Sequence, residues 1–499
     1  MTTDRPDIVI ITSDQHNARV LGAAGDAVVA TPALDRLAEE GAMLERNYCP
    51  SPLCVPSRMS MLTGRTPTQN RVWSLRDTLS SAIPTFAHAL GAVGYRTHLI
   101  GKLHAIGPDQ LMGFGSRSLG DHGPSYPGAP QTDRGAFNGA GPTIESLEHV
   151  GRGQSAYQIR DELVAAEARH FLERVAIERR AGTARSPFCL SLGLLLPHAP
   201  YVARAEDYDL YDGRVPAPSA PEPFGDDLHP FLHWWRLDRG APDVDEETTR
   251  IARTAYWAMV HRMDIIIGGV LDSLERLGLA EDTLVVYTSD HGDQIGEHGL
   301  WWKHVLYEDS VRVPTILRWP GRIPAGRRVS QVSSALDVTA TVLAAAEAPP
   351  LPASPGRDLI PMIRGDEEDW EDVATSEAGL FPVAKPQRMV RRDRWKLTYY
   401  HGAPLQLFDL DTDPHERIDL ADDPAHADTR GEMLALLFQD WDPDEIAGEM
   451  QQHLEEQAIL AAWGRNVAPP EPYRFDMPPT WTYLDSDDAG RTGGGESSA

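Results

Sequence analysis

The chain has 499 residues, of which 41% are hydrophobic and 24% are charged, a composition typical of folded globular proteins and not of disordered ones. Its 74 acidic residues outnumber its 46 basic residues and give a formal net charge of −28, a field that excludes nucleic acid and anionic lipid as favoured partners. The length allows one large α/β domain with a smaller domain beside it.

The start of the chain, MTTDRPDIVIITSDQ, has no basic segment followed by an apolar one, and no run of about eighteen apolar residues occurs along the sequence. We therefore expect a cytoplasmic protein without a membrane span. The three cysteines, Cys49, Cys54 and Cys189, are too few for a disulfide framework and are expected to be thiols in a reducing compartment. In an oxidising compartment Cys49 and Cys54 could pair.

Short apolar runs alternate with amphipathic stretches along most of the chain. The first run, DIVIITS at residues 7–13, is rich in β-branched residues and ends in polar Asp14, as a buried parallel strand does. The same reasoning predicts strands at 95–101, 188–200 and 283–293, and helices at 31–42, 83–94, 156–180 and 246–278. This alternation predicts a large, doubly wound, mixed but mostly parallel sheet flanked by helices.

The C-terminal part differs in pattern from the rest of the chain. A proline-rich linker at 348–359 is followed by strand-like segments that suggest a smaller α+β subdomain with an antiparallel sheet. We expect a large main domain at 1–375, the antiparallel-sheet subdomain at 376–467, and an extended tail at 468–499. The glycine- and serine-rich end of the tail is expected to be disordered, and its proline-rich part offers a way to reach a second copy in a homo-oligomer.

Polar residues follow four of the predicted strands: Asp14-Gln15, Lys102 to His104, His198, and Asp290-His291. In doubly wound sheets, ligands bind beyond the carboxyl ends of the strands. If the two acidic pairs meet, their oxygen and imidazole donors suit one divalent cation, Ca²⁺ first and then Mn²⁺ or Mg²⁺. The alternative is that Asp14 and Asp290 cap the next turn or helix, as aspartate often does after a strand.

Cys54 lies in the segment SPLCVPSRMSMLTGR, residues 51–65. A buried intracellular cysteine is most often a small apolar core residue. A nucleophilic thiolate would need positive charge nearby, and Arg58, one helical turn further on, could supply it. Neither interpretation accounts for Pro56, two residues after Cys54, or for the sequence LTGR that ends the segment.

The stretch CVPSRMSMLTGR, residues 54–65, resembles the signature of the type I sulfatases, in which this cysteine is oxidised to formylglycine by a separate formylglycine-generating enzyme. Five other segments are similar to that family: IVIITSDQ, IGKLHAIG, LLPHAPY, TSDHGDQIGEHGLWWKH and LFDLDTDPHERIDLA. Their order holds over roughly residues 7 to 425. The resemblance implies the alkaline phosphatase superfamily fold and the hydrolysis of a small-molecule sulfate monoester.

The resemblance also implies a role for each site residue. The metal ligands would be Asp14, Gln15, Asp290, His291 and the modified Cys54, and Arg58 would hold the aldehyde hydrate. Lys102, His104 and Lys303 would bind the sulfate oxygens, and His198 would contact the sulfate or protonate the leaving oxygen. In the family the hydrate attacks sulfur with one hydroxyl, and deprotonation of the other expels sulfate. Serine, with one hydroxyl, would have no such way to reset.

Gln15 and His291 differ from the residues that many relatives have at these two positions. With Asp14 and Asp290 they resemble the metal set of choline sulfatases and phosphonate monoester hydrolases, and this leaves the metal identity open. A phosphonate monoester or phosphodiester hydrolase is therefore the alternative function. A noncatalytic oxyanion-binding protein with an unmodified thiol is a remote alternative. Choline, aryl and carbohydrate sulfates are all candidate substrates. Trp73, Trp301 and Trp302 could form an aromatic cage for a choline head group, although aromatic residues this near a core are more often packing residues.

Overall fold

The computed structural model describes residues 5–130, 141–183, 186–220, 228–239, 241, 244–367, 369–380 and 383–485. The glycine- and serine-rich end, for which disorder is expected, lies outside these residues.

The main sheet has eight strands in the order β10-β2-β9-β8-β1-β6-β3-β4. Strand β9 runs antiparallel to its two neighbours β8 and β2, and the other pairs are parallel. The strands span Asp7–Ser13 (β1), Ala42–Tyr48 (β2), Arg96–Gly101 (β3), Ser116–Ser118 (β4), Phe188–Gly193 (β6), Thr283–Ser289 (β8), Thr315–Arg318 (β9) and Arg327–Ser334 (β10). The expected mixed, mostly parallel, doubly wound sheet is confirmed.

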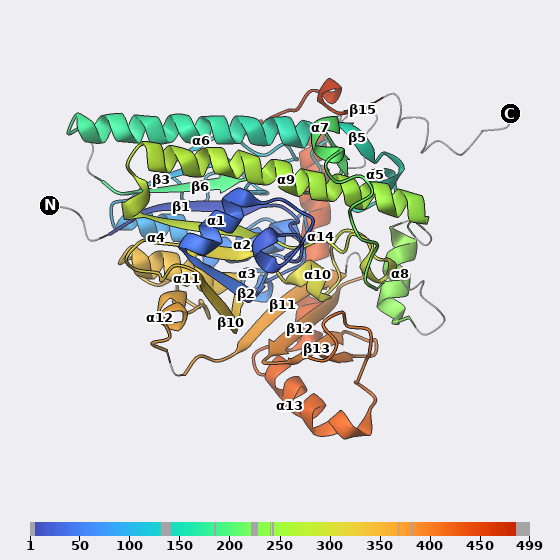
Figure 1. Cartoon of the computed structure of the whole chain (residues 1–499). Coiled ribbons are helices and arrows are strands. Elements are labelled where there is room, and N and C mark those ends of the chain that lie inside the picture. The colour runs from blue at the N-terminus through green and yellow to red at the C-terminus, as the bar shows by residue number, and fades with distance from the viewer. Residues whose placement is uncertain are drawn as a thin grey trace.

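Strand β1 lies at the centre of this sheet because its side chains are apolar on both faces. Val9 and Ile11 belong to the core shared with α6 (Ala156–Arg180) and α9 (Glu246–Arg276). Ile8 and Ile10 belong to the core shared with α2 (Cys54–Thr63), α4 (Phe86–Ala92) and α11 (Ala335–Ala345). Figure 1 shows the two long helices along one face of the sheet and the shorter ones on the other. A strand covered on both faces needs a continuous apolar run.

The predicted helices form close to their expected bounds. Helix α6 starts after Ser155 and α9 starts after Asp245, and each of these side chains accepts a hydrogen bond from a backbone N–H of the first turn. The remaining helices are α1 (Pro32–Glu40), α3 (Pro67–Asn70), α5 (Glu145–Glu148), α7 (Ala205–Tyr208), α8 (Pro230–Asp238), α10 (Glu308–Val311) and α12 (Leu359–Arg364).

A second, four-stranded antiparallel sheet lies in the C-terminal part, in the order β11-β12-β13-β14. Its strands span Val373–Leu380, Lys385–Arg392, Trp395–Tyr400 and Gln406–Asp409, and helices α13 (Ala427–Leu437) and α14 (Pro443–Val467) follow. Buried Lys396 of β13 links this sheet to α10 of the main domain, because its Nζ lies 3.1 Å from Glu308 Oε1. The same Nζ lies 2.7 Å from Glu416 Oε1 in the C-terminal part. The domain boundaries themselves stay predictions.

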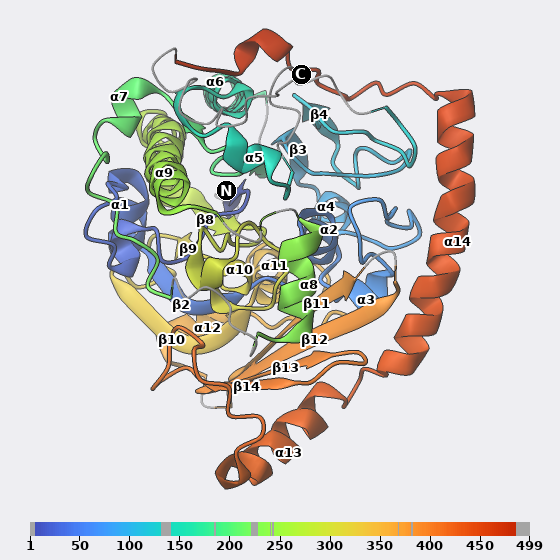
Figure 2. The same ribbon diagram turned by 90° about the vertical axis from the view of Figure 1, so that its right-hand side faces the viewer.

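The chain after α14 returns to the main domain, as Figure 2 shows. Met477 packs with Ala156, Tyr157 and Leu195, and Phe475 and Trp481 lie against the same cluster. Strand β15 (Tyr483–Leu484) then joins β5 (Gly151–Gln154) and β7 (Val202–Ala203) in a three-stranded sheet. The described part of the tail therefore packs on its own chain, and the expected homo-oligomer stays a prediction.

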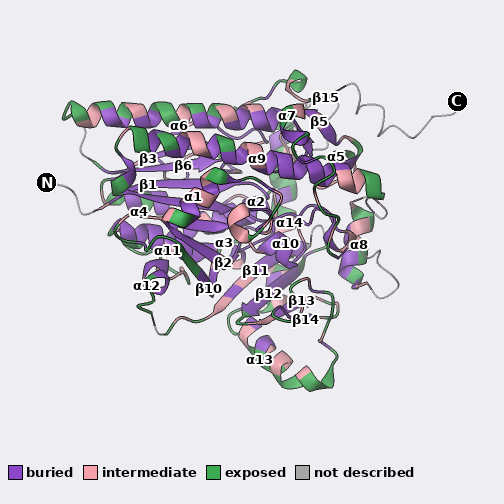
Figure 3. Cartoon of the chain, in the orientation of Figure 1, coloured by how far each residue is buried: buried purple, intermediate pink, exposed green. Residues whose placement is uncertain are grey.

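Figure 3 shows that the central strands of the main sheet and the inner faces of α6 and α9 are buried, whereas the edge strand β10 is partly exposed. All three cysteines are buried, and none of them forms a disulfide within the described residues. Among the described helices, none combines the length and the apolar character that a membrane crossing requires.

Candidate active site

The carboxyl ends of four neighbouring strands, β8, β1, β6 and β3, meet at one edge of the main sheet. Ser13 is paired with Ser289 in the register, so the residues that follow, Asp14 and Asp290, emerge side by side. Lys102 follows β3, and His198 lies in the loop after β6. The sheet thus brings together all four groups of polar residues that the sequence places after strands, as expected for a ligand site at this edge.

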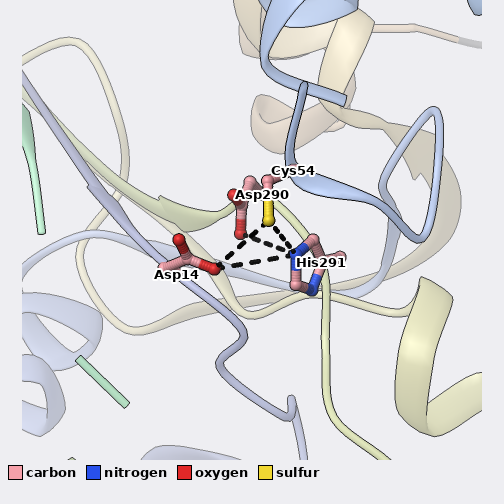
Figure 4. A group of neighbouring side chains, drawn as sticks. All are labelled: Asp14, Cys54, Asp290 and His291. Carbon is pink, nitrogen blue, oxygen red and sulfur yellow. Dashed lines mark hydrogen bonds and ion pairs between the residues drawn. The ribbon is translucent and has the colours of Figure 1, made fainter. Parts of the chain in front are cut away.

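Figure 4 shows Asp14, Cys54, Asp290 and His291 grouped around one point. One ligand-type atom of each side chain lies within 4.8 Å of the other three, and all four residues are buried. His291 is oriented by its Nδ1, which donates to the Gly292 carbonyl at 2.9 Å. This leaves Nε2 facing the cluster, 3.6 Å from an oxygen of each carboxylate. The two acidic pairs therefore converge.

Gln15 extends this donor set. Its Nε2 donates to Asp293 Oδ2 at 2.6 Å, which turns Oε1 away from Asp293, and Oε1 is buried without a hydrogen-bond partner among the described residues. The backbone of Gln15 has a φ of 68°, and its carbonyl accepts a 2.7 Å bond from Tyr256 Oη. A buried amide oxygen without a donor beside two carboxylates fits a hard divalent cation.

Asp293 is a site residue that the sequence reasoning did not single out. Besides Gln15, its carboxylate accepts hydrogen bonds from Tyr201 Oη at 2.7 Å and from the backbone N–H of Trp302 at 3.0 Å. It therefore orients a candidate ligand and fixes the loop that leads to Lys303. Its place in the sequence DHGD, two residues after His291, is the signal that could have identified it.

Cys54 is the first residue of α2, where the helix N-terminus favours negative charge. Arg58, one turn further on, donates from Nε to Asp290 Oδ2 at 2.7 Å and from Nη1 to the Lys102 carbonyl at 3.2 Å. Because both residues lie on the same face of one helix, the ion pair with Asp290 fixes Cys54 against the donor cluster.

Three further predicted residues surround the thiol. Lys303 Nζ lies 3.0 Å from Cys54 Sγ, Lys102 Nζ contacts Asp14, and His104 also lowers the pKa of the Cys54 thiol. Burial alone would raise the pKa of the Cys54 thiol, but the charges of Lys102 and Lys303 outweigh it and hold this pKa well below its usual value. The site therefore stabilises negative charge at residue 54.

His198 completes the ring of residues. Its Nδ1 donates to the Ala199 carbonyl at 2.6 Å and its Nε2 accepts from Lys303 Nζ at 2.8 Å. Burial, followed by the nearby Lys303 charge, lowers the pKa of His198, so the imidazole is neutral near pH 7. The structure thus places all ten candidate catalytic and metal-binding residues, Asp14, Gln15, Cys54, Arg58, Lys102, His104, His198, Asp290, His291 and Lys303, in one site.

The local charge opposes that of the whole chain. Four lysines occur among the 46 basic residues, and two of them, Lys102 and Lys303, are buried beside Cys54. Two unit charges about 4 Å apart interact by roughly 4 kcal/mol at an effective dielectric near 20. Contacts of this kind outweigh distant acidic residues, and within the site the three cations Arg58, Lys102 and Lys303 outnumber the carboxylates in contact with them, Asp14 and Asp290.

Of the two roles open to the three tryptophans, a choline cage or core packing, their positions support packing. Trp73 belongs to the core beneath the C-terminal sheet, and Trp301 and Trp302 belong to the main core, with exposed fractions of 3% and 2%. The indole Nε1 of Trp302 donates to Ser146 Oγ. All three rings are packing residues, as large aromatic side chains near a core usually are.

A mostly parallel, doubly wound sheet with anion-binding residues at the carboxyl ends of its central strands defines an alkaline phosphatase-like hydrolase. The chain belongs to the sulfatase family, whose model matches residues 6–348, and the model of the N-sulphoglucosamine sulphohydrolase C-terminal region matches residues 296–441. The protein is therefore an enzyme of the sulfuric ester hydrolase class.

Two curated relatives illustrate the range of the family. The choline-sulfatase of Rhizobium meliloti is 36% identical over 438 residues, which cover 85% of this chain and 84% of the relative. The multifunctional alkaline phosphatase superfamily protein PehA of Trinickia caryophylli is 28% identical over 479 residues, which cover 85% of this chain and 92% of the relative.

Solved structures give the same fold. The phosphonate monoester hydrolase of Agrobacterium radiobacter superimposes with a TM-score of 0.71 at 25% identity, over 90% of this chain and 96% of that one. A protein solved with its substrate D-glucosamine-2-N,6-O-disulfate also gives a TM-score of 0.71, at 23% identity, over 88% and 99% of the two chains.

Proposed function

We propose that this protein hydrolyses a sulfate monoester to an alcohol and inorganic sulfate, with a formylglycine made from Cys54 and one bound divalent cation. The observation that carries the proposal is the position of Cys54 at the start of α2. Its Sγ, which marks the position of the reacting oxygen, lies 3.1 Å from His291 Nε2 on the ligand side and 3.0 Å from Lys303 Nζ on the cationic side.

Four donors would hold the cation: Asp14, Gln15, Asp290 and His291, with the oxygen at position 54 as a further ligand. The unpartnered Gln15 Oε1 and the lone pair of His291 Nε2 support this assignment. Three oxygen-bearing side chains and one imidazole favour Ca²⁺, with Mn²⁺ or Mg²⁺ as alternatives. When bound, the ion would supply charge stabilisation and orientation for the nucleophilic oxygen.

The remaining residues would bind and orient the sulfate. Lys102, Lys303 and His104 would donate to its nonbridging oxygens, which carry the charge that develops in the transition state. Arg58, fixed by Asp290, would hold the hydrate at residue 54. His198 carries no proton toward Cys54, because Nδ1 donates to Ala199 and Nε2 accepts from Lys303. This argues against protonation of the leaving oxygen by His198 and supports a role in orienting the Lys303 ammonium.

The modification of Cys54 is tested by mass spectrometry of the tryptic peptide from Asn47 to Arg58. After co-expression with a formylglycine-generating enzyme, we expect a peptide in which an oxygen replaces the sulfur and two hydrogens of Cys54. An unmodified thiol would exclude the proposed nucleophile and would favour the noncatalytic, oxyanion-binding alternative. The peptide from protein expressed without that enzyme is the control.

A phosphonate monoester or phosphodiester hydrolase with the same nucleophile is the second candidate. It is favoured by the similarity to the phosphonate monoester hydrolase of Agrobacterium radiobacter. Lys102 and His104, which the family resemblance assigns to sulfate binding, favour the sulfatase. Release of sulfate from choline, aryl and carbohydrate sulfates, measured beside release of 4-nitrophenol from 4-nitrophenyl phenylphosphonate and bis(4-nitrophenyl) phosphate, decides between them.

The similarity to a choline-sulfatase over 85% of this chain makes choline sulfate the first compound to assay. Absence of turnover with choline sulfate, beside turnover of an aryl or carbohydrate sulfate, would remove choline from the candidates and leave the sulfatase proposal intact. Turnover of the phosphonate ester with no sulfate release from any compound would overturn it.

A further inference from the structure

The loop after β3 carries two of the proposed sulfate-binding residues, Lys102 and His104, and it has no regular secondary structure of its own. Three consecutive backbone N–H groups of this loop point at one carboxylate, that of Asp121. Oδ1 accepts from Leu103 N and from His104 N, each at 2.9 Å, and Oδ2 accepts from Ala105 N at 3.2 Å.

This carboxylate is held in place as an anion. Asp121 is 5% exposed, and its Oδ2 also accepts a 2.7 Å bond from Arg117 Nη2. Burial would raise the pKa of Asp121, but the Arg117 guanidinium and the hydrogen bonds outweigh it and lower the pKa. Arg117 in turn donates to the carbonyls of Gln110 and Gly101. The carboxylate and its counter-ion are therefore hydrogen-bonded to the backbone at the start of the loop and again at Gln110.

The loop needs such support because of the backbone of His104, whose φ is 62°. A residue with a side chain adopts this left-handed conformation only when the surroundings fix it. The N–H bonds of Leu103, His104 and Ala105 to a single charged acceptor supply that constraint, since hydrogen bonds to an ionised group are stronger than neutral ones.

The position of this loop matters for the reacting centre because the loop carries Lys102 and His104. Lys102 contacts Asp14 with its Nζ and accepts a bond from Arg58 at its carbonyl, and His104 lies two residues further along the same loop. We propose that Asp121 is the positioning residue of this site, which sets the loop backbone so that Lys102 and His104 reach the sulfate. Its effect on catalysis rests on the proposed sulfatase function.

Two variants test the proposal. Asp121→Ala removes both oxygens, and Asp121→Asn keeps one acceptor but turns an NH₂ group toward Ala105 N and Arg117, which are both donors. The matched control is Asp264→Asn. Asp264 is also fully buried and accepts two backbone N–H groups, but these belong to the start of α1, an element without a proposed site residue.

The kinetic measurement is sulfate release by the mature holoenzyme with 4-nitrophenyl sulfate. We expect kcat to fall about 10- to 100-fold in Asp121→Ala, because a small misplacement of binding groups costs this much. The same substitution in a Lys102→Ala, His104→Ala background should cost less than about threefold, because residues that act through one another are not additive. An equal loss in both backgrounds would show a general structural role and would overturn the proposal.

The second measurement does not depend on activity. Amide hydrogen exchange, followed by mass spectrometry of fragments covering residues 103–106, should be at least about tenfold faster in Asp121→Ala than in the wild type and unchanged in Asp264→Asn. Unchanged exchange in Asp121→Ala would overturn the proposal. If the wild type hydrolyses no sulfate ester, the sulfatase function fails, and the exchange experiment still decides whether Asp121 holds this loop.

Discussion

Replacement of Lys303 tests directly how much a buried positive charge beside residue 54 contributes to catalysis. Lys303 Nζ lies 3.0 Å from Cys54 Sγ and 2.8 Å from His198 Nε2, and the residue is 1% exposed. Lys303→Met removes the positive charge and keeps most of the volume of the side chain, so the loss of activity reports on the charge and not on a cavity.

The expected magnitude follows from the distance. A unit charge about 3 Å from the reacting atom contributes roughly 5 kcal/mol at an effective dielectric near 20. If about half to three-quarters of a unit charge develops at the reacting atom in the transition state, removal of Lys303 should raise the activation free energy by about 3 to 4 kcal/mol. This corresponds to a loss of roughly 10²- to 10³-fold in kcat. Lys303→Arg should not restore activity, because the longer planar guanidinium has no room between Cys54 and His198.

The assay is sulfate release at saturating substrate, with the thermal midpoint of each variant measured beside it. Lys385→Ala is the control, since Lys385 is an exposed lysine on β12 and its loss should leave kcat within about twofold of wild type. A Lys303→Met enzyme that keeps more than about a third of the wild-type kcat would refute the reasoning, because the charge beside residue 54 would then contribute almost nothing to the transition state.

Three further predictions concern the nucleophile, the metal and a buried carboxylate. Cys54→Ala should abolish turnover and leave the thermal midpoint within a few degrees of wild type; retained activity would exclude Cys54 as the precursor of the nucleophile. Removal of metal by a chelator should lower the thermal midpoint and activity together, Ca²⁺ should restore both, and Asp290→Asn should not respond. Burial raises the pKa of Asp264 to about 6, so between about pH 4 and 6 the folded protein keeps a proton that the unfolded chain has released. The protonated carboxyl therefore stabilises the fold below about pH 4, and this contribution is lost as the pH rises through about 6. Relative to Asp264→Asn, the wild-type free energy of unfolding should therefore fall by up to about 3 kcal/mol from pH 4 to 7, and a pH-independent difference in chemical denaturation would contradict this.

The elements and the four polar strand ends were predictable because each rests on a local pattern. Strand β1 consists of seven buried residues with an unbroken apolar run from Ile8 to Ile11, and α6 covers the residues that its periodicity predicts. The rest of the site was not predictable in this way. Asp121 lies in an irregular loop and Arg117 in the short edge strand β4, and their partners include backbone groups of residues 101–110, which leave no pattern of side-chain types.

The sequence by itself determined the family, the doubly wound sheet and the ten candidate site residues, because short-range periodicity and contiguous motifs do not depend on distant contacts. The tertiary structure alone decided that Asp14 and Asp290 meet, because this depends on the parallel register of β1 with β8, strands about 270 residues apart in the chain. It also decided that Trp73, Trp301 and Trp302 are core residues. Burial results from packing among segments distant in sequence, and a residue type does not reveal which neighbours will cover it.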